Sequence, residues 1–183
     1  MHSGFRASEP GNLYAAPRPL APTEIFTTMP ARIVVPGIES LPDYLGVEFG
    51  PSPWLTIDQA RVDAFAAATG DDQWIHTDPE RARRESPLGQ TIAHGYLTLA
   101  LAPALLAEIF EVKSCSRIIN YGIERLRLRE PVPVGSRLRL AGKILNLRNV
   151  PGGAVRVAFE LHWELEGARR PPGRAEAVYI YFP

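Results

Sequence analysis

The sequence predicts an α+β domain in which a curved antiparallel sheet wraps around one long, apolar central helix. Residues 92–112 are apolar on nearly every side at helical spacing, which is typical of a helix buried on most of its surface. Later segments alternate apolar and polar side chains, as half-buried strands do. Short turns join these segments, so consecutive strands should pair antiparallel and the helix should cover one face of the sheet.

The composition is that of an ordinary globular protein. The chain has 183 residues, 45% of them hydrophobic and 22% charged, with a formal net charge of +0. This length suffices for one domain with a real core. A neutral chain lacks the basic surface of a nucleic-acid-binding protein. The single cysteine, Cys115, forms no internal disulfide, and no Cys/His spacing resembles a metal site.

Neither a signal peptide nor a membrane span is indicated. The N-terminus is polar and interrupted by prolines, without the apolar core of a signal peptide. The longest apolar run, residues 96–107, is too short to cross a bilayer. We therefore expect a cytoplasmic protein with no membrane or nucleic-acid partner.

Residues 1–36 are predicted to form an extended, proline-rich tail. Such a stretch neither continues a helix nor pairs as a central strand. At most it lies along the body or along a partner subunit. Its prolines are Pro10, Pro17, Pro19, Pro22, Pro30 and Pro36. The rest of the chain, residues 37–183, is predicted to be a single domain.

A short helix over 38–44 and a strand over 46–49 are expected to open the domain. The next helix should begin at a capping box formed by Thr56 and Gln59, in which each side chain satisfies a free backbone N–H. Gly70 is placed to end it. One apolar face of this helix is formed by Val62, Phe65, Ala66 and Thr69.

Two further helices are predicted before the sheet. Asp78 followed by Pro79 is typical of a helix start, which predicts a short helix over 80–85. The long apolar helix over 92–112 contains Pro103, which should kink it or remove one hydrogen bond.

The alternating segments are predicted strands, at 116–128, 137–148, 154–165 and 174–182. Residues 150–153 form a hairpin connection and residues 167–173 a longer one. A strongly curved sheet wrapped around a helix is called the hotdog fold. Its exposed edge strand predicts that two protomers pair edge to edge, with ligand sites where they meet.

The segments around the apolar helix resemble a known family. Residues 68–76, ATGDDQWIH, resemble the Gly-Asp-x-x-x-x-His signature of the MaoC-like (R)-specific enoyl-CoA hydratases, and are most similar to the branch named after nodulation protein N. Further similar segments follow in the family's order, at residues 93–99, 120–122 and 131–137. The resemblance covers roughly residues 45–183.

The resemblance implies an enzyme that adds water across the C2–C3 double bond of a trans-2-enoyl-CoA to give a (3R)-hydroxyacyl-CoA. Asp71 and His76 would hold the water, with Asp71 as its general base and His76 orienting it and helping to return a proton to C2. The backbone N–H of Gly95 would stabilise the thioester oxygen as the enolate forms. The family implies an acyl-CoA substrate, a homodimer or dimer of dimers, and neither cofactor nor metal ion.

Substrate contacts are further implied for Gln73, Trp74, His94 and Tyr96. Alternatives remain for each of the last three, because His94 could instead bond a neighbouring turn and the two aromatic side chains could serve packing. Two positions depart from many relatives: Pro103 stands where several have serine, and Trp74 where many have proline.

Other interpretations stay open for the main candidates. Asp71 could be a turn residue, His76 a surface histidine, and Gly95 a glycine needed only for tight packing. A stripe of arginines could be solvated or could contact CoA phosphates, at Arg125, Arg127 and Arg129. Two alternative functions are a hotdog thioesterase and a non-catalytic acyl-thioester-binding subunit. The spacing of Asp71 and His76 argues against the thioesterase, and the presence of both residues argues against a non-catalytic subunit.

Overall fold

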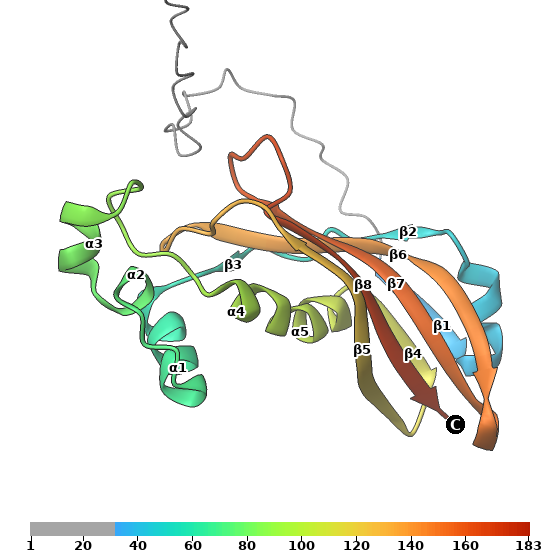
Figure 1. The fold of residues 1–183 in the computed structure, drawn as a ribbon. Helices are drawn as coiled ribbons and strands as arrows, with labels where there is room; N and C mark the ends of the chain where they lie inside the picture. Colours follow the sequence, from blue (N-terminus) through green and yellow to red (C-terminus); the bar gives the residue numbers. More distant parts are fainter. Residues whose placement is uncertain (1–31) are drawn as a thin grey trace, which may run out of the picture.

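A strongly curved sheet wraps over a helical segment, and a separate group of helices lies beyond one end of that sheet (Figure 1). The computed structural model describes residues 32–183. The main sheet has the strand order β2-β6-β7-β8-β5, and β3 also pairs with β6. The predicted α+β hotdog architecture is confirmed.

All pairings in the main sheet are antiparallel. Its strands are β2 (Glu48–Phe49), β3 (Leu55–Thr56), β5 (Arg117–Leu128), β6 (Arg137–Val150), β7 (Ala154–Leu165) and β8 (Gly173–Phe182). The predicted long strands are confirmed to within a few residues at their ends. The alternation in β7 works as expected, because every second side chain is fully buried against the helices, as at Val157, Phe159, Leu161 and Trp163.

The helical segment beneath the sheet is not one continuous helix. It consists of α4 (Gly95–Ala100) and α5 (Ala102–Ala107), and the interruption lies beside Pro103, where a kink was expected. The predicted helix over 92–112 is nevertheless too long, because its last residues belong to strand β4 (Phe110–Ser114). Pro103 lies in the first turn of α5 and has no amide hydrogen to donate to the preceding turn, which explains the break. The segment is also not buried on every side, since Tyr96 is 69% exposed while Leu97 is buried.

The domain begins earlier than predicted. Strand β1 (Ile33–Gly37) pairs in parallel with β4 (Phe110–Ser114), and Val35 is fully buried. Residues 33–36, assigned to the tail from the sequence, are thus part of a strand. Pro36 is tolerated there because β1 pairs only with β4 within the described residues. Residues 1–31 of the predicted tail lie outside the described residues.

The remaining helices are η1 (Ile38–Tyr44), α1 (Gln59–Thr69), α2 (Trp74–Thr77), α3 (Pro79–Glu85) and the short η2 (Pro151–Gly153) between β6 and β7. Asp58 caps α1 by accepting a hydrogen bond from the backbone N–H of Arg61 at 2.8 Å. The predicted capping box is therefore wrong, since Thr56 belongs to β3. Gly70 ends α1 in a left-handed conformation, with φ of 76°, as expected. No helix within residues 32–183 is long and apolar enough to cross a membrane.

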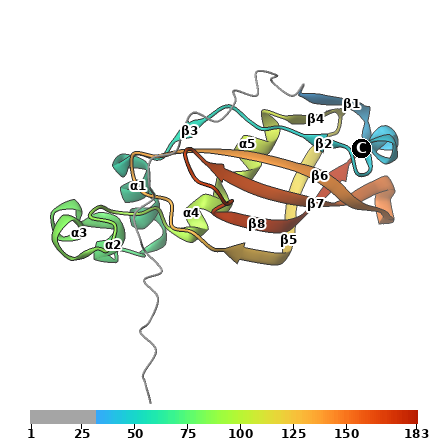
Figure 2. The same cartoon turned by 90° about the horizontal axis from the view of Figure 1, so that it is seen from above.

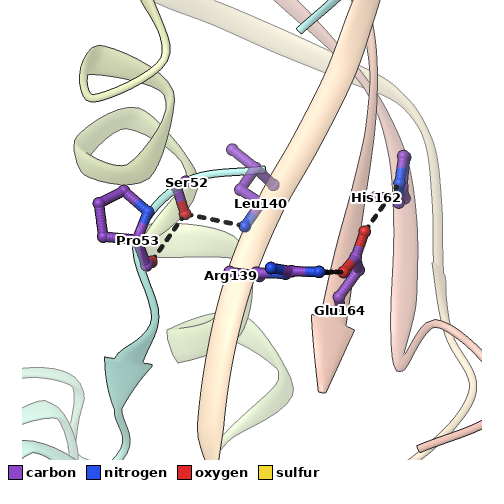
Figure 3. A network of polar contacts seen from close by, with 6 residues as sticks. All are labelled: Ser52, Pro53, Arg139, Leu140, His162 and Glu164. Atoms are coloured by element: carbon purple, nitrogen blue, oxygen red, sulfur yellow. Dashed lines mark hydrogen bonds and ion pairs between the residues drawn. The ribbon is translucent and has the colours of Figure 1, made fainter. Parts of the chain in front are cut away.

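Ser52 completes the hydrogen bonding of β6 between the short strands β2 and β3 (Figure 3). Its backbone N–H donates to the carbonyl of Leu140 at 2.7 Å, and its hydroxyl oxygen accepts from the Leu140 N–H at 3.0 Å. On the solvent side of the sheet, Arg139 and His162 both contact the carboxylate of Glu164, at 2.6 and 3.7 Å. Ser52 thus satisfies both backbone groups of Leu140 where neither β2 nor β3 pairs with β6.

Candidate active site

The fold brings the turn after α1 against the start of α4. Gly70 ends α1 and lets the chain turn directly into Asp71, while α2 carries His76 and the α4 N-cap is His94. A carboxylate oxygen of Asp71 and one ring nitrogen from each histidine all lie within 4.8 Å of one another. The two residues predicted to hold the water are therefore adjacent in space, with a third titratable side chain beside them.

His76 is buried and its ring orientation is defined. The side chain is 6% exposed, and Nδ1–H donates to the carbonyl of Ile92 at 2.7 Å. Because that carbonyl can only accept, the neutral ring keeps its lone pair on Nε2. Burial lowers the pKa of His76 below its usual 6.5, and the opposing effect of the Ile92 carbonyl is smaller. His76 is therefore a neutral acceptor near pH 7.

Asp71 presents an ionised carboxylate. Its Oδ1 accepts a hydrogen bond from Gln73 Nε2 at 3.0 Å. This hydrogen bond, with smaller contributions from the neighbouring His94 and His76, lowers the pKa of Asp71 below its usual 3.8. The site therefore combines a carboxylate with a neutral imidazole, which together can hold one water molecule.

His94 connects the start of α4 to the turn that carries Asp71. It is 2% exposed, and its Nε2–H donates to the backbone carbonyl of Asp71 at 2.8 Å. Its ring stacks on that of His76 with centroids 3.8 Å apart, and the ring of Phe65 packs on it at 5.0 Å. This contact with a neighbouring turn is the structural alternative expected for His94.

A cavity of about 420 Å³ lies beside His76. Its lining is mostly apolar and also includes Gly95 and Thr98. A methyl group on Gly95 would lie 2.5 Å from Cδ1 of Leu128, which also lines the cavity. Close packing against Leu128 therefore favours glycine at residue 95, as the packing alternative for Gly95 expects. The other lining residues include Ile75, Ile92, Pro131 and Val132.

Residues 42–160 match the model of a family described as the MaoC like domain. The protein 3-hydroxyacyl-thioester dehydratase Z of Mycobacterium tuberculosis (strain ATCC 25618 / H37Rv) is 44% identical over 136 residues, which cover 74% of this chain and 89% of that protein. The chain belongs to the MaoC-like dehydratase family. It is accordingly a hydro-lyase.

Other relatives of this MaoC-like dehydratase agree. Nodulation protein N of Rhizobium leguminosarum bv. viciae is 41% identical over 146 residues, which cover 78% of this chain and 89% of that protein. The unliganded (R)-hydratase PhaJ1 of Pseudomonas aeruginosa superposes with a TM-score of 0.57 at 25% identity, covering 75% of this chain and 81% of that one. The (R)-hydratase of A. caviae superposes at 0.60 with 23% identity, covering 76% of this chain and 96% of that one, and supports the hotdog fold.

The structure places the candidate substrate contacts Gln73, Trp74 and Tyr96 in different surroundings. Gln73 bonds the carboxylate of Asp71, as described above. Trp74 lies under the guanidinium of Arg81, 4.5 Å from it, and is not among the residues that line the cavity. Tyr96 also lies outside the cavity lining, on the exposed face of α4. Substrate contact by Trp74 and Tyr96 therefore stays a prediction.

Several residues of the site were not predicted. Thr98 lines the cavity, and its position four residues after His94, on the same helix face, is a local signal that could have found it. The segment from Leu128 to Val132 also lines the cavity. It includes Arg129, one of the arginines that could contact CoA phosphates, and the start of the family-like segment at residues 131–137. Only the folded chain brings that segment against α4.

Within the described residues, Asp71, His76 and His94 are also the group whose ligand atoms could surround a metal ion. The imidazole rings stack with an interplanar angle of 28°, so their in-plane lone pairs lie in nearly parallel planes. A metal-free site stays a prediction.

Proposed function

We propose that this MaoC-like dehydratase is an (R)-specific enoyl-CoA hydratase. It adds water to C3 of a trans-2-enoyl-CoA to give the (3R)-hydroxyacyl-CoA, and it catalyses the reverse dehydration. The single observation that carries this proposal is the adjacency of the Asp71 carboxylate to the neutral ring of His76, which lines a mostly apolar cavity. The dehydratase named among its relatives acts on 3-hydroxyacyl thioesters, which supports the same substrate class here.

In this mechanism Asp71 and His76 act on one water molecule. The carboxylate of Asp71 accepts a proton as the water oxygen bonds to C3, while Nε2 of His76 accepts the water's second hydrogen bond and orients it. The C2–C3 π electrons move toward the thioester carbonyl, forming an enolate. C2 then takes a proton from the pair, so both residues end in the protonation state in which they began.

Gly95 is proposed to stabilise the enolate oxygen. Its N–H belongs to the first turn of α4, where backbone N–H groups have no acceptor within the helix. The residue lines the same cavity as His76, so a thioester bound there can place its carbonyl against this N–H. The substrate's own thioester activates C2, and we propose that the reaction needs no cofactor or metal ion and takes place in the cytoplasm.

We further propose that two copies pair through β5 into a homodimer. This strand forms one edge of the main sheet and bonds only β8 within the described residues (Figure 2). An exposed row of backbone N–H and C=O groups flanked by apolar side chains is a template for strand pairing. The exposed apolar side chains on it include Ile118, Ile119, Tyr121 and Ile123, at 42–62%. Sedimentation of the protein and of the Ile119→Pro variant tests this, since proline should yield monomers.

The activity is tested with purified protein, crotonyl-CoA and a longer enoyl-CoA. Loss of the conjugated enoyl absorbance without release of free thiol, together with a 3R product, is the expected result. Release of free thiol would instead identify a thioesterase. No reaction in either assay, from protein that still binds acyl-CoA, would identify a non-catalytic binding subunit.

A further inference from the structure

The short helix α2, which carries His76, is held by a side chain from α1. Nε2 of Gln59 donates to the backbone carbonyl of His76 at 2.7 Å and to Oδ1 of Asp63 at 2.7 Å. The hydroxyl of Thr91 donates to Oε1 of Gln59 at 2.6 Å. One amide thus joins α1, the last turn of α2 and the segment that precedes α4.

These contacts supply hydrogen-bond donors for the last carbonyls of α2, which have none within the helix. The carbonyls in the last turn of a helix have no donor within the helix, and α2 has 4 residues. Ile92 N–H donates to the carbonyl of Ile75 at 3.0 Å, and Gln59 satisfies the carbonyl of His76. The His76 ring donates in turn to the Ile92 carbonyl, next to Thr91. Backbone and ring of His76 are therefore held by one closed set of hydrogen bonds.

Only an amide fits between these groups. Its Nε2 faces two acceptors and its Oε1 faces one donor. A carboxylate at residue 59 would place an oxygen against the His76 carbonyl and against the charged Asp63. Thr91 is 3% exposed, so its hydroxyl has no access to bulk water if its partner is lost.

We propose that Gln59 and Thr91 are positioning residues that hold the imidazole of His76 with Nε2 directed at the reacting water. This inference rests on the proposed hydratase function. The side chains of both residues bond each other, Asp63 and the His76 carbonyl, so both act through His76. Gln59 and Thr91 hold the backbone of His76 at a fixed distance from the Ile92 carbonyl, and this carbonyl orients the His76 ring.

The test compares Gln59→Glu and Thr91→Val with the wild-type protein. Both should lower kcat for crotonyl-CoA by about 10-fold, with KM little changed, because small misplacement of a catalytic group is costly. Water admitted around a loosened ring should raise the pKa of His76, which moves the acidic limb of the pH–rate profile upward. Thr91→Ser keeps the hydroxyl and should recover most of the rate lost in Thr91→Val.

A matched control separates positioning from simple loss of stability. Ser52→Ala removes another buried hydroxyl, one that accepts from the backbone N–H of Leu140 in β6. It should lower the melting temperature and leave kcat and the pH profile unchanged. Equal loss of kcat in Ser52→Ala and Thr91→Val at equal loss of stability would overturn the proposal.

The ¹⁵N spectrum of the His76 ring gives a readout that needs no activity. In the wild-type protein it should show the proton on Nδ1, and Gln59→Glu and Thr91→Val should shift the tautomer balance and the titration. Unchanged His76 spectra in both variants would contradict positioning. A wild-type protein that hydrates no enoyl-CoA would refute the proposed function, and these spectra would still decide the role of Gln59 and Thr91.

Discussion

The imidazole of His94 stacks on that of His76, with centroids 3.8 Å apart, while its Nε2–H donates to the Asp71 carbonyl at 2.8 Å. One buried side chain thus fixes the relative position of both residues that would hold the water. A positive charge on His94 would also disfavour protonation of His76. The same contact explains how a turn after α1 and the N-terminus of α4 form one site.

Replacing His94 with phenylalanine should preserve the stack and remove the hydrogen bond. The Asp71 carbonyl then loses its donor, and the free energy of unfolding should fall by about 1–3 kcal/mol. We expect kcat to fall about 10-fold because the Asp71 turn is no longer held. Urea unfolding and hydration kinetics measure the two effects. His162→Phe, on the outer face of the sheet, is the control, and an equal effect there would contradict this role.

Asp71→Asn should lower kcat by a factor on the order of 10² or more, since an amide cannot accept the water's proton. The neighbouring Asp72→Asn removes the same charge one residue away and should retain most activity. Hydration of crotonyl-CoA by both variants, with circular dichroism to verify folding, makes the comparison. Full activity in folded Asp71→Asn protein would refute the mechanism.

Gly95→Ala should slow hydration by about 10-fold, because the added methyl group obstructs approach to the backbone N–H. The same methyl group would clash with Leu128, so packing alone could also explain a loss. The double variant Gly95→Ala/Leu128→Ala removes that clash and should stay slow relative to Leu128→Ala. Recovery of the Leu128→Ala rate in the double variant would show that residue 95 serves packing only.

Activity should persist below pH 6.5, the usual pKa of histidine, because burial lowers the pKa of His76. The acidic limb of kcat/KM should therefore lie below that value. The unfolded chain binds the additional proton first as the pH falls from 6.5 toward the folded-state pKa. The contribution of His76 to the free energy of unfolding consequently decreases through that window. An acidic limb at or above pH 6.5 would contradict the assignment.

Ser52→Ala should reduce the free energy of unfolding by about 1–3 kcal/mol, because it leaves the Leu140 N–H without a partner at a buried position. Urea denaturation measures the change. Ser114→Ala, at an exposed position at the end of β4, should be nearly neutral. Equal stability of Ser52→Ala and wild-type protein would show that water replaces the hydroxyl.

Local chemistry made much of the fold predictable. The strand pattern of β7 follows from burial of every second side chain, and it can be recognised without knowing the partners of the strand. Gly70 and the Asp78-Pro79 pair act within a few residues of their own position, so their helix boundaries were also predictable. The prediction for Thr56 failed because Asp58 offers a competing cap, and pairing of Thr56 with β6 depends on residues 81 positions later in the chain.

The sequence by itself determined the long strands β5 to β8, several helix ends, the interruption beside Pro103, the family, and the choice of Asp71 and His76 as a pair. Tertiary structure alone decided that β1 pairs with β4 and that Gln59 and Thr91 join α1 to the residues around His76. The physical reason is the distance along the chain over which each interaction acts. Periodicity and capping act over one or two turns, whereas the bond from Thr91 to Gln59 crosses 32 residues and exists only once the chain has folded.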